Sequence, residues 1–101
     1  MNYQKLRSGD KIPILGLGTW QLTGDECIET VQKAIKLGYR HIDTAAAYGN
    51  HQEVSKGIQN SEIERENLFI TSKIWRDSLY NSEVISGTKE ILNELNLDYL
   101  D

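Results

Sequence analysis

The stretch that decides the fold is Gly38-Tyr39-Arg40-His41-Ile42-Asp43-Thr44-Ala45-Ala46-Ala47-Tyr48-Gly49-Asn50. It begins where a helical pattern ends, passes through a short apolar segment, and finishes with a carboxylate, a turn of small residues and a phenol. Buried strands rarely end on an aspartate unless a neighbouring group uses the charge. We therefore expect the rest of the chain to support Asp43 or to supply its partners.

Composition and charge narrow the class of protein. The 101 residues are 39% hydrophobic and 26% charged, and their net charge of −4 argues against a nucleic-acid-binding protein. No window approaches the roughly 20 apolar residues that a membrane span needs, and the first ten residues lack the apolar core of a secretory signal. Cys27 is the single cysteine, which excludes an internal disulfide. We therefore expect one small cytoplasmic domain.

Strand and helix patterns alternate along the chain. A tight turn at residues 7–10 predicts an N-terminal hairpin, and the apolar residues 14–17 predict a short strand buried on both faces. Thr23 with Glu26, and Asn50 with Glu53, match patterns in which a side chain caps a helix. The remaining predicted elements are a helix from Thr23 to Gly38, a strand over 39–43, a helix from Asn50, a strand over 68–73, a helix from Asn81 or Ser82, and the beginning of a strand over 97–101.

This order implies a parallel sheet with right-handed crossovers. The strands end near Leu17, Asp43 and Lys73, and a repeat of about 26 to 30 residues suits a (β/α)₈ barrel or a doubly wound sheet. In both folds, ligands bind beyond the carboxyl ends of the strands. The side chains that we expect to converge there are Trp20, Asp43, Tyr48, Lys73 and Trp75.

Asp43, Tyr48 and Lys73 form the candidate catalytic group. An ammonium beside a phenol favours the phenolate, so Lys73 would make Tyr48 a better proton donor near neutral pH. Asp43 would hold the ammonium in place, and two tryptophans would supply flat walls for a substrate pocket. The alternative for Asp43 and Lys73 is a structural ion pair, and the alternative for Tyr48 is a packing role.

Other polar residues have simpler interpretations. His41 is expected to point away from Ile42 and to be structural, while His51 at a helix start is expected to be a solvated surface residue. Cys27 is expected to be a packing residue. The glycines around Leu17 do not form a dinucleotide fingerprint, and no cluster at ligand spacing predicts a metal site.

Several motifs in register resemble the aldo-keto reductase family. The stretch from Gly38 to Asn50 is similar to the family signature around its catalytic Asp and Tyr. Residues 15–20 resemble its first strand, residues 69–75 its third, and residues 95–101 the approach to its fourth. The resemblance covers essentially the whole chain. It implies a (β/α)₈ barrel closed at the bottom by the hairpin, and NADPH-linked reduction of aldehydes or ketones to alcohols.

The resemblance also implies roles for single residues. Tyr48 matches the general acid, and Asp43 and Lys73 match the residues that tune it. The positions that match the nicotinamide side of the cofactor site are Gly18, Thr19, Trp20 and Asp43. Those that match the substrate pocket are Trp20, Tyr48 and Trp75. NADH stays open as the cofactor, and His51 and Ser55 depart from the acidic residue and the glycine that are usual at their positions.

The resemblance makes residues 1–101 the N-terminal portion of such a reductase domain: the hairpin, the first three β/α units and the start of strand 4 of an incomplete barrel. In the family, the active-site His and most cofactor-binding residues follow later. We therefore expect a fragment that binds NADPH poorly and reduces nothing measurable alone.

Two alternatives remain open for the function. One is a non-catalytic barrel used for binding, which the intact Asp43, Tyr48 and Lys73 argue against. The other is an interaction fragment that completes its sheet by self-association. For a complete reductase, the expected partner is a small carbonyl substrate, with no nucleic acid and no membrane, and the expected state is a monomer.

Overall fold

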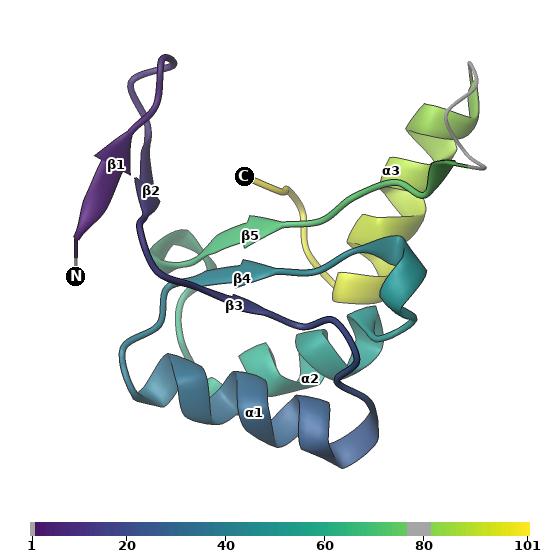
Figure 1. Cartoon of the computed structure of the whole chain (residues 1–101). Helices are drawn as coiled ribbons and strands as arrows, with labels where there is room; N and C mark the ends of the chain where they lie inside the picture. The colour runs from purple at the N-terminus through teal and green to yellow at the C-terminus, as the bar shows by residue number, and fades with distance from the viewer. Residues whose placement is uncertain (1, 77–81) are drawn as a thin grey trace.

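The computed structural model describes residues 2–76 and 82–101, in which a parallel sheet carries helices on one face (Figure 1). An N-terminal hairpin of β1 (Tyr3–Lys5) and β2 (Lys11–Pro13) confirms the predicted turn. The remaining elements are β3 (Gly16–Gly18), α1 (Gly24–Lys36), β4 (His41–Asp43), a 3₁₀ turn η1 (Ala46–Tyr48), α2 (His51–Ser61), a second 3₁₀ turn η2 (Arg65–Asn67), β5 (Phe69–Thr71) and α3 (Ser82–Leu95).

The three strands β3, β4 and β5 lie in sequence order and are parallel, as predicted. Leu17 pairs with Ile42, and Ile42 pairs with Ile70, so the middle residues of the three strands are aligned across the sheet. Helix α1 joins β3 to β4, and α2 joins β4 to β5, because parallel neighbours need a crossover. All three carboxyl ends therefore point the same way, and the hairpin lies at the opposite end (Figure 1).

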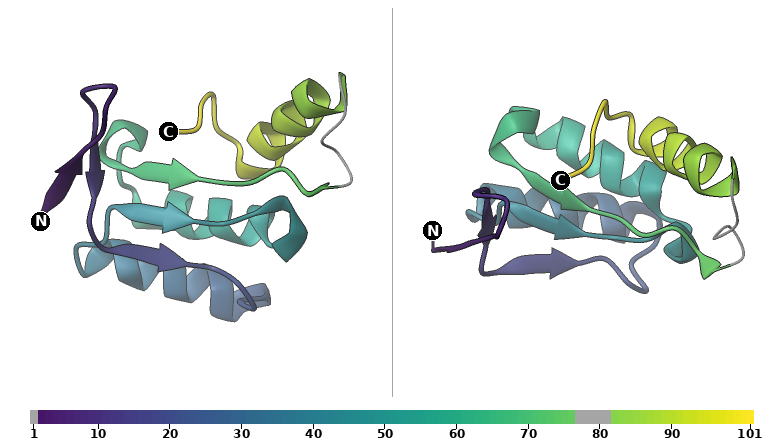
Figure 2. Two further views of the ribbon diagram at one scale, coloured as in Figure 1. Left: turned by 45° about the horizontal axis from the view of Figure 1, so that its top comes forward. Right: turned by 90° about the horizontal axis from the view of Figure 1, so that it is seen from above.

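Figure 2 shows the helices on one face of the sheet, and the buried apolar side chains of the core come from the strands and from these helices. Side chains alternate along a strand, so the middle residue of β4 and β5 faces the helices while its neighbours face the other way. Ile42 and Ile70 are fully buried for this reason. The other buried apolar residues of this core are Cys27, Val31, Ile35, Val54, Ile58, Leu68, Ile91 and Leu95.

The first parallel strand differs from its prediction. Residues 14–17 were expected to be buried on both faces, but Ile14 and Leu15 are 65% and 56% exposed and β3 begins only at Gly16. Strand β3 lies at one edge of the three-stranded sheet, and helices cover only one face. Apolar sequence alone did not reveal that the other face of this strand is uncovered in the described residues.

Residues 97–101, where the sequence predicts the beginning of a fourth strand, do not yet form a strand. Residues 97–101 return alongside β5, where the Asp101 N–H donates to the Ile70 carbonyl oxygen at 3.0 Å. The Ile70 N–H in turn donates to the Asp101 carboxylate at 2.9 Å. The Asp101 carboxylate thus accepts the hydrogen bond that a backbone carbonyl of a neighbouring strand would otherwise accept from the Ile70 N–H.

The helices begin and end near the predicted residues, but the predicted side-chain capping hydrogen bonds are not formed. Thr23 precedes α1 with extended backbone, but its side chain makes no capping hydrogen bond. Gly38 follows α1 with φ of 110°, which confirms the predicted glycine stop. Ser82 begins α3, and the alternative start at Asn81 lies outside the described residues. On α3, Ile91 and Leu95 are buried, whereas Val84 is 36% exposed.

Candidate active site

Backbone hydrogen bonds continue past the ends of the strands and bring the three following segments together. The Thr19 N–H donates to the Asp43 carbonyl oxygen at 3.0 Å, and the Thr44 N–H donates to that of Thr71 at 2.9 Å. One step further, the Ala46 N–H donates to the Lys73 carbonyl oxygen at 3.0 Å. The predicted site residues therefore stand on neighbouring backbone segments whose relative positions are fixed.

Asp43 and Lys73 form an ion pair at this edge. The Lys73 Nζ donates to the Asp43 carboxylate and also to the Thr44 carbonyl oxygen, at 2.9 Å from the latter. The side chain of Lys73 is 48% exposed and that of Asp43 is 42% exposed. Solvent therefore screens their attraction, and the ion pair adds little to the stability of the fold. The ammonium is nevertheless held by two acceptors, one from the last residue of β4 and one from the residue after it.

Tyr48 lies beside this ammonium. It ends the 3₁₀ turn η1, and Gly49 follows it in the left-handed conformation with φ of 65°, which glycine adopts without strain. The Lys73 Nζ lies 5.5 Å from the centroid of the Tyr48 ring. The structure thus brings together the three residues of the candidate catalytic group at one edge of the sheet.

The other predicted residues divide into two groups. Gly18 pairs with Asp43 across the sheet, and Thr19 is fully buried with its hydroxyl donating to the Asp43 carbonyl oxygen at 3.4 Å. Trp20 follows with 68% of its surface exposed. Trp75, 47% exposed, lines a cavity of about 150 Å³ beside α3, to which Trp20 does not contribute. That Trp20 and Trp75 line one substrate pocket stays a prediction.

Asn50 has a role that the sequence prediction missed. It lies at the N-terminus of α2, but its side chain makes no cap hydrogen bond. Instead, its amide nitrogen donates to the carbonyl oxygens of Thr19 and Leu22 at 2.8 and 3.0 Å, and its oxygen accepts from the Thr44 hydroxyl at 3.0 Å. This buried side chain ties the segment after β3 to the segment after β4.

The prediction for His51 was wrong. Its side chain is 3% exposed, with Nε2 at 2.8 Å from the Ser72 hydroxyl and Nδ1 at 3.0 Å from the Glu94 carboxylate. Position 51 was assigned to the surface because it is polar and opens a helix. Helix α3 covers it, and that contact joins residues 43 positions apart.

His41 and Cys27 behave as predicted. The His41 ring packs edge-on against Phe69 and its Nε2 lies 3.0 Å from the Thr71 hydroxyl, on the face away from Ile42. Burial lowers the pKa of His41 below 6.5, although the Asp43 carboxylate acts in the opposite direction. Cys27 is fully buried in the core, and burial raises the pKa of its thiol to about 11. It is therefore a packing residue.

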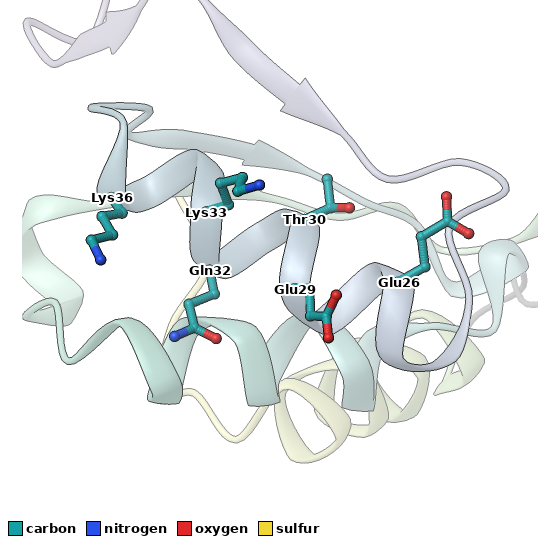
Figure 3. A pocket seen from close by; sticks show the side chains of 6 residues that line it. All are labelled: Glu26, Glu29, Thr30, Gln32, Lys33 and Lys36. Carbon is teal, nitrogen blue, oxygen red and sulfur yellow. The ribbon is translucent and has the colours of Figure 1, made fainter.

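A separate hollow lies away from this edge, on the surface of α1. It measures about 560 Å³ and runs along α1, whose polar side chains line it (Figure 3). Glu26 lies toward the N-terminal end of the helix and Lys36 toward its C-terminal end, as the helix dipole favours. This surface is a solvated helix face and contains none of the predicted site residues.

Two features are absent from residues 2–76 and 82–101. These residues contain no group of three or more His, Cys, Asp or Glu side chains arranged to hold a metal ion. Among the helices described, none has the length and apolar character that crossing a membrane requires.

Comparison with known sequences identifies a family and its members. A model of the aldo/keto reductase family matches residues 14–101. The chain is 45% identical over 97 residues to methylglyoxal reductase DkgA of Escherichia coli K12. This match covers 96% of this chain and 34% of that protein. It is 41% identical over 105 residues to aldo-keto reductase family 1 member A1 of Gallus gallus, covering 99% and 32%. The chain thus spans about a third of the length of these relatives.

Solved structures agree with these matches. An aldo/keto reductase from Brucella melitensis superposes with a TM-score of 0.94 at 41% identity, over 99% of this chain and 39% of that one. Bombyx mori aldo-keto reductase in complex with NADP superposes with a TM-score of 0.88 at 39% identity, over 99% and 36%. The predicted fold class is confirmed: the three β/α units form part of a (β/α)₈ barrel.

Proposed function

Because this chain belongs to the aldo/keto reductase family, we propose that it carries the proton donor of an NADPH-dependent oxidoreductase that reduces aldehydes or ketones to alcohols. The observation that carries this proposal is the position of one ammonium. The Lys73 Nζ is held by Asp43 and Thr44 and lies 5.5 Å from the Tyr48 ring centroid. Such an arrangement suits delivery of a proton to an oxygen on which negative charge develops.

Tyr48 is the proposed general acid. Its hydroxyl would donate a proton to the carbonyl oxygen of the substrate, and the nearby ammonium would stabilise the phenolate that remains. Asp43 would orient that ammonium rather than take part in proton transfer itself. Because Asp43 ends β4 and Lys73 lies two residues after the end of β5, the register of these two strands sets this geometry.

The cofactor side of the site lies at the end of β3. Gly18 has open space where a Cβ would stand, and the Trp20 indole is largely exposed, so a flat ring has room to approach this edge. Gly18, Thr19, Trp20 and Asp43 would line the nicotinamide side, and Trp20, Tyr48 and Trp75 would contact the substrate. The bound cofactor would supply the hydride. NADPH is proposed on family grounds, since a related protein was solved with NADP.

The chain by itself is expected to be inactive. It supplies three β/α units, whereas a complete barrel takes about 250 residues and encloses its site with loops from all eight units. Residues 1–101 are proposed to be the N-terminal portion of the reductase domain. A cytoplasmic location and a monomeric complete form remain predictions.

The test compares the chain alone with a chimera. Residues 1–101 are joined to the part of the Escherichia coli reductase DkgA that follows the matched region, and NADPH consumption is measured with methylglyoxal. The chimera should consume NADPH, and Tyr48→Phe should slow it at least about a hundredfold, the usual contribution of a general acid. The chain alone should show no consumption above the blank.

Two results would contradict the proposal. A folded chimera that binds NADPH but gains nothing from the Tyr48 hydroxyl would remove Tyr48 as proton donor. A chain of 101 residues that reduces methylglyoxal, and loses that activity in Tyr48→Phe, would show that the three units suffice alone.

A further inference from the structure

A chain of three polar side chains, in which His51 is buried and Ser72 and Glu94 are partly exposed, lies behind the candidate site. His51 is the first residue of α2, Ser72 follows β5 directly, and Glu94 lies near the end of α3. The His51 ring joins the other two, with 2.8 Å from Nε2 to the Ser72 hydroxyl and 3.0 Å from Nδ1 to the Glu94 carboxylate. These contacts connect the segment after β5 to two helices.

The direction of these hydrogen bonds follows from the groups involved. A carboxylate can only accept, so the Nδ1 of His51 donates its proton to Glu94. In the neutral ring, Nε2 is then the acceptor, and the Ser72 hydroxyl donates to it. Every member of the chain is satisfied in this arrangement, which favours a single orientation of the buried ring.

The order of serine, histidine and carboxylate is also that of a hydrolytic triad. A nucleophile must face a space where its substrate fits. The cavity beside His51, about 200 Å³, is lined by Ala46, Gly49, His51, Gln52, Glu53 and Glu94, and not by Ser72. The three residues are therefore better suited to holding the backbone of the segment after β5 than to hydrolysis.

Ser72 and Lys73 are consecutive residues directly after β5, and they contact different elements: Ser72 contacts His51 of α2, and Lys73 contacts Asp43 of β4. Fixing Ser72 to His51 therefore also restricts the backbone that carries Lys73, whose ammonium reaches Asp43. We propose that His51 is a positioning residue, which through Ser72 and Glu94 fixes the ammonium of Lys73 beside Tyr48. This inference rests on the proposed role of Lys73 in proton delivery.

Two substitutions at one position test the proposal. In His51→Gln, the side-chain amide reaches the place of Nε2 and can still accept from Ser72. In His51→Asn, the shorter amide reaches only the place of Nδ1, so the Ser72 contact is lost. The full chain is treated with a limiting amount of acetic anhydride, and acetylation of each lysine is measured by mass spectrometry, with Lys33 and Lys89 as internal references.

We expect Lys73 to be acetylated about fivefold faster in His51→Asn than in the wild type. The loss of the hydrogen bond between residue 51 and Ser72 would leave the Lys73 ammonium less firmly held. Ser72→Ala, a smaller change, should have the same effect. His51→Gln should retain the wild-type rate. Circular-dichroism unfolding curves show whether each variant is folded.

The proposal is overturned if His51→Asn and Ser72→Ala leave the Lys73 rate unchanged, or raise it only in parallel with Lys33 and Lys89. It is also overturned if His51→Gln behaves like His51→Asn, because the Ser72 contact would then be irrelevant. Acetylation needs neither cofactor nor substrate. A failure of carbonyl reduction by the chimera would therefore be distinguishable from a failure of this inference.

Discussion

His41 lies on the face of the sheet away from the helices, where its Nε2 meets the Thr71 hydroxyl and its ring meets Phe69. Its pKa in the folded chain lies below 6.5, chiefly because burial disfavours the charged ring. The unfolded chain therefore binds a proton first as the pH falls. The stabilising contribution of His41 is complete above pH 6.5 and is lost as the pH falls through the lowered pKa.

We accordingly predict that the free energy of unfolding decreases as the pH is lowered from neutrality past 6.5, the ordinary pKa of histidine. His41→Gln, which keeps a polar side chain but cannot titrate, should show a weaker decrease. Urea unfolding followed by circular dichroism at several pH values measures both slopes. Equal slopes in the variant and the wild type would show that His41 does not contribute to the pH dependence.

The residues of the candidate catalytic group could be predicted from sequence because each follows a strand, and parallel strands end at one edge. The order of the strands alone was enough to predict that Asp43, Tyr48 and Lys73 lie close together. Asn50 and His51 could not be placed in this way. Their partners, from Thr19 to Glu94, come from segments whose positions depend on how α2 and α3 pack. An asparagine and a histidine at a helix start carry no local signal of such contacts.

At the scale of secondary-structure elements, α1 and α2 approach closely at Gly57. A Cβ added there would stand 2.7 Å from the Cβ of Val31 and 2.8 Å from the carbonyl oxygen of Ile28. The sequence alone suggests that alanine would suit this helical position better, by about 1 kcal/mol. The contact between the helices reverses that preference, because the backbone and branched side chain of α1 cannot give way without moving the helix.

We predict that Gly57→Ala lowers the free energy of unfolding by about 1–3 kcal/mol, the usual cost of overpacking a core. Chemical denaturation is the measurement. Asn60→Ala, at an exposed position of the same helix, is the matched control and should be neutral or slightly stabilising. A stabilised Gly57→Ala protein would mean that α1 and α2 can separate at little cost.

Element boundaries were predictable to the extent that a local signal sets them. Gly38 ends α1 because the chain needs a positive φ there, and glycine provides it. The extent of β3 was not predictable, since an apolar sequence such as residues 14–17 does not say which faces are covered. The same limit applies to residues 97–101, where the apolar pattern does not show how many of the residues pair with β5; the backbone hydrogen bond to β5 comes from Asp101.

At the scale of the whole molecule, the edges of the three-stranded sheet are places where another strand could pair. An uncovered edge strand can pair with another copy. One edge of β5 is engaged by Asp101, whose carboxylate accepts from the Ile70 N–H and from the Arg65 guanidinium at 2.9 and 2.7 Å. Arg65 also stacks over Tyr99 at 3.9 Å and donates to its carbonyl oxygen, so it holds the returning segment against the strand.

Asp101→Ala should therefore have two effects. Loss of the carboxylate should lower the free energy of unfolding by about 1 kcal/mol, because a charge-assisted hydrogen bond is removed and the Ile70 N–H loses its acceptor. It should also increase concentration-dependent association, because the N–H of Ile70 becomes available to another strand. Denaturation curves and sedimentation velocity at several protein concentrations measure the two effects. Asp98→Ala removes the same charge at an exposed position nearby, so it separates a change in net charge from the opening of the edge. If both variants associate equally, charge rather than the edge of β5 controls self-association.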